Sequence, residues 1–305
     1  MRIRCGDRVR ITNGPWIRPM QTSNVLNSTL VVRPMAVSDL TAAVQLSQEQ
    51  NWPHRIEDWR LFLDLGEGLV AEREGQLVGT TMAWRFGEDM ATIGLVAVSP
   101  SHQGQGIGRQ LMEAMIGRLG DRSILLNATE EGTPLYKKLG FVETGRIRQH
   151  QGKLSDVPLP ALQPGERVRP TGKADASLPE LYSTASGMNR EVLFQALAKH
   201  SRTAVHTHDH VPGGFAMLRR FGRGWSIAPV IASDLSSAKA LILHWLAVKQ
   251  GSFCRLDVTE DSELGPWLES LGLPCVDTVR TMVRGKAPSG ASDAKVFAIA
   301  AQALG

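Results

Sequence analysis

The residue pattern with the most evident chemistry is a glycine-rich turn at residues 103–108, with the sequence Gln-Gly-Gln-Gly-Ile-Gly. An apolar run at residues 93–98 precedes the turn, and a run typical of a helix follows at residues 109–116. A turn between a strand and a helix directs several backbone N–H groups at one point, at the positive end of the helix dipole. Glycine lets a phosphate approach these amides, because no side chain stands in the way. The turn therefore predicts a binding site for a diphosphate.

Two familiar phosphate-binding motifs fit this turn poorly. The dinucleotide fingerprint G-x-G-x-x-G needs a glycine where this chain has Arg109. The ATP-type loop needs a lysine directly after its last glycine, and none follows here. An ordinary turn without a ligand remains a further interpretation. Taken alone, the glycine spacing leaves the identity of the diphosphate open.

A second motif lies downstream of the turn. A short apolar strand is expected at residues 123–127, and residues 132–141 follow with the sequence Gly-Thr-Pro-Leu-Tyr-Lys-Lys-Leu-Gly-Phe. A tyrosine on a short helix before Leu-Gly-Phe, together with the turn at 103–108 after a strand ending in valine, resembles the GCN5-related N-acetyltransferase (GNAT) superfamily. The resemblance covers residues 30–150. Four residue pairs upstream resemble a subfamily with a second, degenerate acetyltransferase-like domain: Asn51-Trp52, Asp58-Trp59, Gly79-Thr80 and Phe86-Gly87.

The resemblance implies a fold and a reaction. The fold class would be α+β (mixed α/β), a GNAT fold in which helices flank a twisted mixed sheet. The reaction would be transfer of an acetyl group from acetyl-CoA to the primary amine of a small molecule, by direct attack in a ternary complex. Such a transfer needs neither a nucleophilic cysteine nor a metal. The residues expected to hold the coenzyme are Val96, Ala97, Val98, Gln103, Gly104, Gln105, Gly106, Ile107, Gly108, Asn127 and Tyr136.

Two of these residues would act through their side chains. Tyr136 resembles the general acid that protonates the CoA thiolate, and the pKa of a phenol is close enough to that of a thiol for a proton to be shared. The alternative is a tyrosine that only packs on its short helix. Asn127 resembles the residue that hydrogen-bonds the pantetheine arm or the tyrosine, although an asparagine that simply ends a strand fits equally well.

The sequence indicates the general base and the acceptor pocket less clearly. Glu88 precedes the strand that leads into the turn, where the family often has an acid, but a solvated turn is the alternative. Trp52, beside a proline, is the candidate for a pocket wall, whereas Trp59 fits the apolar stripe of a helix and is expected in the core. Histidines at 206, 208 and 210 share one face of an extended segment. A solvated hairpin edge explains them better than a metal site.

The order of elements repeats along the chain, which predicts two domains. Residues 30–148 form the expected acetyltransferase domain, residues 149–166 a polar linker with three prolines, and residues 167–286 the second domain. Residues 167–170 (Arg-Val-Arg-Pro) echo residues 31–34 (Val-Val-Arg-Pro), as though the chain restarts. The second copy has no glycine turn, and Trp267 stands near the tyrosine position. It is therefore expected to be a degenerate GNAT-like scaffold, followed by an apolar tail at residues 287–305.

Composition excludes several classes of protein. The chain has 305 residues, three cysteines and a net charge of +4, and no apolar run reaches the length of a membrane span. Five arginines and one acid fall within residues 1–29, so this basic arm, which we expect to be disordered, carries the whole net charge. The neutral body argues against nucleic acid as a partner. We expect a cytoplasmic protein; a non-catalytic acyl-CoA-binding or sensing protein is the alternative function, and the sequence does not indicate the oligomeric state.

Overall fold

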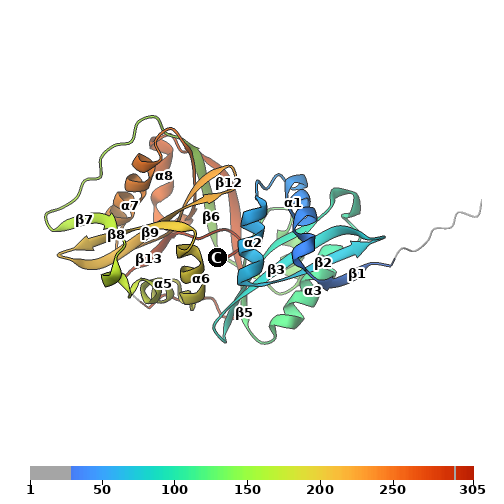
Figure 1. The fold of residues 1–305 in the computed structure, drawn as a ribbon. Helices are drawn as coiled ribbons and strands as arrows, with labels where there is room; N and C mark the ends of the chain where they lie inside the picture. The colour runs from blue at the N-terminus through green and yellow to red at the C-terminus, as the bar shows by residue number, and fades with distance from the viewer. Residues whose placement is uncertain (1–28, 292) are drawn as a thin grey trace, which may run out of the picture.

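The computed structural model describes residues 29–305 except residue 292, so the predicted basic arm, apart from Thr29, lies outside the described residues. The described chain forms two halves side by side (Figure 1). The first half comprises β1 (Val31–Pro34), α1 (Leu40–Glu49), α2 (Ile56–Leu65), β2 (Glu67–Arg73), β3 (Gln76–Phe86), β4 (Met90–Val98), α3 (Ile107–Leu119), β5 (Ser123–Ala128), α4 (Thr133–Lys138) and β6 (Val142–Lys153).

The second half repeats this order of elements and adds one strand. It comprises β7 (Glu166–Pro170), α5 (Leu178–Ser186), α6 (Glu191–Ala198), β8 (Ser201–His208), β9 (Val211–Phe221), β10 (Gly224–Ala232), α7 (Leu235–Val248), β11 (Phe253–Thr259), α8 (Leu264–Ser270), β12 (Cys275–Arg284) and the additional β13 (Lys295–Ala298). The predicted α+β class and the predicted duplication are therefore both confirmed.

An ion pair at the start of each half shows how closely the copies correspond. Arg33 donates two hydrogen bonds to the carboxylate of Asp39, at 2.8 and 2.9 Å. Arg169 donates two to Asp175, at 2.7 and 2.8 Å, with the same spacing of six residues. Each carboxylate also accepts a hydrogen bond from the backbone N–H three residues before it. The guanidinium in each pair lowers the pKa of its aspartate, so both carboxylates stay ionised and hold the chain where it leaves β1 or β7.

The thirteen strands that the structure describes belong to one continuous sheet, and the two halves exchange strands at its centre. The order is β1-β2-β3-β4-β5-β12-β6-β11-β13-β10-β9-β8-β7. β12 of the second half therefore lies between β5 and β6, and residues 147–153 of β6 pair with β11 of the second half. Residues 149–153, expected in the linker, instead continue β6, because β11 pairs with all of them on one side and β12 pairs with Gln149 and His150 on the other. Likewise, residues 295–298 of the expected tail form β13.

The helices cover both faces of the sheet, and α2 of the first half contacts α6 of the second. α3 packs on one face of the first half, and α1 and α2 pack on the other; α7 is placed like α3, and α5 and α6 like α1 and α2 (Figure 1). The largest core combines both halves, with Trp59 and Phe62 from α2 beside Tyr182 from α5 and Phe215 from β9. Trp59 is fully buried, as its place in the helical stripe predicted. In the described part of the chain, no helix is both long and apolar enough to cross a membrane.

Candidate active site

The glycine-rich turn presents a row of free backbone N–H groups. Gly104 and Gly106 have φ angles of +76° and +78°, in the left-handed region that favours glycine. A Cβ atom added at either position would meet nothing within 4 Å, so the turn opens to solvent. The first backbone hydrogen bond of α3 runs from the Gln110 N–H to the Gly106 oxygen, at 3.1 Å. Within the described chain, the backbone N–H groups of residues 103–109 have no hydrogen-bond acceptor. They lie at and just before the N-terminus of α3, where helix N–H groups are normally unpaired.

Side chains from α1, β4 and α4 fix the position of this turn. The Val98 carbonyl oxygen, at the end of β4, accepts hydrogen bonds from the side-chain amides of Gln50 and Gln103, both at 3.2 Å. A Cβ atom added to Gly108 would lie 3.6 Å from Leu135 and 3.7 Å from Val98. The first turn of α3 therefore packs where the end of β4 meets the helix that carries the second motif. The two motifs, about 30 residues apart in sequence, are neighbours in the fold.

The strands β4 and β5 separate as they approach this turn. They pair in parallel only where Met90–Thr92 lies beside Ser123–Leu125. Beyond Thr92, the β5 side of β4 has no strand partner among the residues that the structure describes. Leu95, with φ of +53°, coincides with a shift in the register between β4 and β3. An open edge therefore runs along Val96, Ala97 and Val98 to the glycine turn, and an extended ligand could pair with it as a missing strand does.

Tyr136 lies on α4, within the core that α3 shares with β5. Tyr136 is 8 % exposed, and its ring makes an edge contact with the ring of Phe141, with the ring centroids 6.1 Å apart. Burial raises the pKa of the phenol above its usual value, so the hydroxyl stays protonated at neutral pH. No group in the described chain is hydrogen-bonded to this hydroxyl. Tyr136 therefore has a proton to donate and no internal partner that holds it.

Asn127 is engaged within the protein. Its side-chain N–H donates to the Gln302 carbonyl oxygen at 2.8 Å, and its side-chain oxygen accepts from the Thr281 hydroxyl at 2.8 Å. Both ends of the amide therefore join β5 to β12 and to the tail. Each end of the amide keeps one further hydrogen-bonding position, so the contact expected between Asn127 and the pantetheine arm stays a prediction.

Glu88 and Trp52 lie apart from the turn. Glu88 is in the turn before β4, with its side chain 95 % exposed and 3.3 Å from Arg122. Since β4 extends for roughly 25 Å between this turn and Val98, the structure does not bring Glu88 to the open edge. Trp52 is half-buried after α1, and its ring contacts His54 with the centroids 6.1 Å apart. It packs against the shared core and is not among the residues that line the cavity described next.

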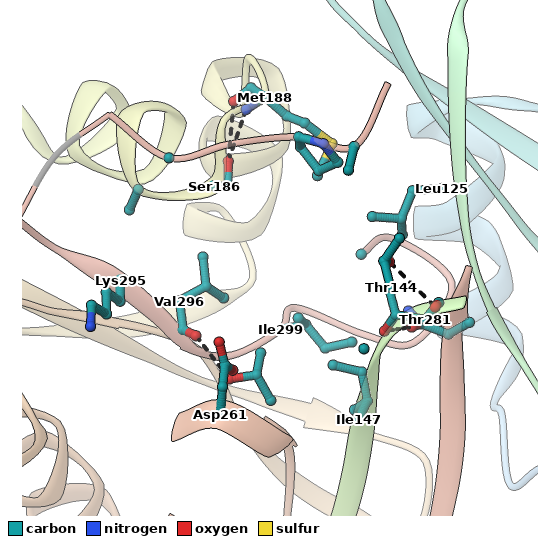
Figure 2. Close-up of a pocket in the computed structure, with 18 of the residues that line it drawn as sticks. Leu125, Thr144, Ile147, Ser186, Met188, Asp261, Thr281, Lys295, Val296 and Ile299 are labelled. Atoms are coloured by element: carbon teal, nitrogen blue, oxygen red, sulfur yellow. Dashed lines mark hydrogen bonds between the residues drawn. The ribbon is translucent and has the colours of Figure 1, made fainter. Parts of the chain in front are cut away.

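A cavity of about 700 Å³ lies between the two halves, next to the point where β4 and β5 separate. Leu125 and Asn127 line it from β5, Thr281 from β12, and Arg190 from the connection between α5 and α6. Figure 2 shows Leu125, Thr144 and Thr281 at one end of the cavity and Asp261 and Lys295 at the other. The cavity therefore reaches β5 beside the point where β4 and β5 separate, although none of the described residues of β4 lines it. In residues 29–305 without 292, no group of three or more His, Cys, Asp or Glu side chains could hold a metal.

The gap between β4 and β5 beyond Thr92 forms a slot, and the corresponding slot between β10 and β11 in the second half is filled by the chain itself. β10 pairs with β11 only at Trp225–Ser226, and β13 then inserts between the two strands, with Ala298 opposite both Val230 and Val258. In place of a glycine turn, Asp234 caps α7 and accepts a hydrogen bond from the Ser237 N–H at 2.8 Å. The second copy therefore lacks both the open edge and the free amides, and it is degenerate as predicted.

The open slot, the helix N-terminus and the duplicated sheet define an acyltransferase-type fold of the GNAT class. Family models described as "Acetyltransferase (GNAT) domain" match residues 64–143 and residues 179–298. The chain therefore belongs to the GNAT superfamily and carries two GNAT domains in tandem.

Known proteins resemble the chain over nearly its full length. An uncharacterised N-acetyltransferase of Bacillus subtilis, YitH, is 26 % identical over 284 residues, which cover 87 % of this chain and 95 % of the relative. A Pyrococcus horikoshii crystal structure has a TM-score of 0.76 at 20 % identity, over 90 % of this chain and 96 % of that one. A tandem GNAT protein from the clavulanic acid biosynthesis pathway has a TM-score of 0.60 at 13 % identity, over 85 % and 100 %. These structural likenesses show the fold alone.

Several residues at this site had no recognisable sequence signal. Arg190 stands between polar residues at the start of a helix, a position that usually reads as solvated, yet it is 1 % exposed. The tail is apolar, but no pattern indicated that Ala303 would lie against Gly94 of β4, where an added Cβ would come within 2.7 Å of it. Contacts between segments this far apart are set by tertiary packing.

Proposed function

We propose that the protein transfers an acetyl group from acetyl-CoA to the primary amine of a small molecule, by direct attack in a ternary complex. One observation carries this proposal. The free backbone N–H groups of residues 103–109 lie next to the unpaired edge of β4, which ends at Val98. The amides suit the diphosphate of CoA, and the edge suits the amide groups of its pantetheine arm. The Bacillus subtilis relative, named as an N-acetyltransferase, supports the same reaction.

The chemistry needs few protein groups. The amine nitrogen forms a bond to the thioester carbonyl carbon, the carbon–sulfur bond breaks, and the amine loses a proton while the sulfur gains one. Tyr136 is the proposed proton donor to sulfur, because its buried phenol is neutral and without an internal partner. Glu88 has no part in this proposal, since its carboxylate is exposed at the other end of β4. The amine must therefore reach the thioester in its neutral form by another means.

The test measures binding and turnover separately. Calorimetry with acetyl-CoA reports the diphosphate site, and thiol release with a panel of amines, followed by mass spectrometry of the products, reports transfer. Tyr136→Phe is expected to lower kcat by about 100-fold or more while the Kd for acetyl-CoA is unchanged. Binding of acetyl-CoA without transfer to any amine would instead support a non-catalytic acyl-CoA-binding or sensing protein. Absence of binding would reject both functions.

We also propose a cytoplasmic location. The two cysteines in the described chain, Cys254 and Cys275, are both free, as is usual in a reducing compartment.

A further inference from the structure

Arg190 is a buried cation without a carboxylate partner. The residue is 1 % exposed, and its guanidinium donates to the Leu304 carbonyl oxygen at 2.7 Å and lies 4.3 Å from the centre of the Phe86 ring. No ion pair joins it to an acid in the described part of the chain, whereas Arg33, Arg55 and Arg169 each have one. Charged side chains are rarely buried unless they are paired.

The guanidinium lies beside the fork between β4 and β5. A Cβ atom added to Gly305 would come 3.4 Å from Arg190 Nη2, 3.2 Å from Leu125 and 3.1 Å from Thr92. Thr92 and Leu125 form the last paired position before the two strands separate. Arg190 also lines the cavity, and its Nη2 group makes no hydrogen bond to any residue of the described chain. The Nη2 group of this buried cation is therefore a free donor beside the last paired position of β4 and β5.

Tyr182 gives an independent indication of a ligand at the same place. Its ring is 5.5 Å from the Arg190 guanidinium, and the residue lines the cavity while only 1 % exposed. The Tyr182 hydroxyl is buried and has no hydrogen-bond partner in the part of the chain that the structure describes. Buried hydroxyls nearly always have a partner in a completed site. Two neighbouring donors thus lack an acceptor.

The other charged residues of the cavity do not supply one. Glu260, Asp261 and Lys295 are exposed, and Asp261 and Lys295 lie at the end away from Leu125 (Figure 2). Arg146 is exposed and pairs with Glu143 at 3.2 Å. At the inner end of the cavity, Arg190 therefore supplies the unpaired side-chain charge, and a guanidinium favours an anionic group.

We infer that the acceptor carries a carboxylate close to its amine, as amino acids do, and that Arg190 binds this carboxylate with help from the Tyr182 hydroxyl. A guanidinium matches a carboxylate because its planar fork can donate two parallel hydrogen bonds. The inference rests on the proposed acetyl transfer and names the class of its acceptor.

This arrangement also explains how an amine could react without a carboxylate base. When the carboxylate pairs with Arg190, its negative charge no longer favours the ammonium form of the neighbouring amine. The fixed guanidinium charge further disfavours that form. Both effects raise the fraction of neutral, nucleophilic amine beside the thioester.

The experiment compares matched acceptors that differ only in this group. α-Amino acids and short ω-amino acids are each paired with their carboxamides, and thiol release from acetyl-CoA gives kcat/KM for every member. We expect a carboxylate acceptor to exceed its carboxamide by about 100-fold or more. Arg190→Gln should remove this preference, and Tyr182→Phe should reduce it by about 10-fold.

Arg219 offers a matched control for the loss of a buried arginine. It is 2 % exposed, donates to the Ala300 carbonyl oxygen at 2.9 Å and lies 4.4 Å from the centre of the Phe221 ring, but it does not line the cavity. Arg190→Lys and Arg219→Lys are expected to lose similar thermal stability, and only the first should weaken the preference for carboxylates.

Several results would overturn the inference. Carboxamides that react as well as their acids would exclude it, as would an undiminished preference in Arg190→Gln or Arg190→Lys, or a panel in which no carboxylate-bearing amine reacts. These results leave the proposed function standing if acetyl-CoA binds and other amines are acetylated. Loss of acetyl-CoA binding in the unmodified protein rejects the function itself, so the two failures are distinguishable.

Discussion

A single methyl group at Gly106 tests whether the glycine turn binds the diphosphate of CoA. In Gly106→Ala, the Cβ atom would enter open space, since no atom lies within 4 Å of its ideal position. The substitution therefore causes no clash inside the protein. It places a methyl group on the surface from which the amides of residues 103–109 point, and it puts alanine at a φ of +78°.

Both effects have a calculable size. A left-handed conformation costs an alanine about 1–2 kcal/mol, which corresponds to a fall in Tm of a few degrees for a protein of this length. A hydrogen bond to a charged group is worth about 1.5–3 kcal/mol. If the methyl group removes one amide–phosphate bond, the Kd for acetyl-CoA should rise by roughly 10- to 100-fold, because each 1.4 kcal/mol is a factor of ten.

Gly251 provides the matched control. It follows α7 in the second half with a φ of +74°, and a Cβ atom added there also meets nothing within 4 Å. Gly251→Ala should therefore lower Tm by the same few degrees and leave the Kd unchanged. Isothermal calorimetry with acetyl-CoA and with pantetheine, which lacks the diphosphate, separates an effect on diphosphate binding from an effect on binding of the pantetheine arm. Only the affinity for acetyl-CoA should depend on residue 106.

Equal binding of acetyl-CoA by Gly106→Ala and Gly251→Ala would contradict a diphosphate site at this turn. A loss of affinity by the same factor for pantetheine and for acetyl-CoA would contradict it too, because the turn would then affect the open edge of β4 and not the diphosphate.

Three further predictions concern the second half, the strand exchange and the half-buried His54. Calorimetry should give one acetyl-CoA per chain, because β13 fills the second slot; two equivalents would contradict this. Residues 29–166 made alone should show no cooperative unfolding by circular dichroism, because β12 is missing between β5 and β6; a sharp transition would show that the first half folds without it. Burial lowers the pKa of His54 from 6.5 to about 4, so this ring stays neutral in the folded protein while the unfolded chain binds a proton below pH 6.5. The unfolding free energy should therefore fall as the pH drops from 6.5 to 4, by at most about 3 kcal/mol, and urea titrations of His54→Gln should show a shallower fall.

The sequence determined the chemistry of the turn and the repeat of elements, because both depend on neighbours along the chain. The positive φ angles at Gly104 and Gly106 follow from residue type, as does the helix cap at Asp234. The arginine that recurs before a proline, at Arg33 and Arg169, marked the duplication correctly. Local patterns of this kind fix the identity and order of the elements.

Only the tertiary structure decided how the two copies are joined and what lies at the acceptor end of the slot. Residues 149–153 read as a polar linker, yet they form part of β6 because β11 and β12 are there to pair with them. Glu88 was a candidate base, yet it lies in the turn before β4, at the opposite end of that strand from Val98. Arg190 gave no sequence signal, yet packing of α5, the tail and the β3–β4 hairpin buries it beside the fork. Backbone pairing between distant strands and burial between two halves depend on residues more than 100 positions away, and no local pattern encodes them.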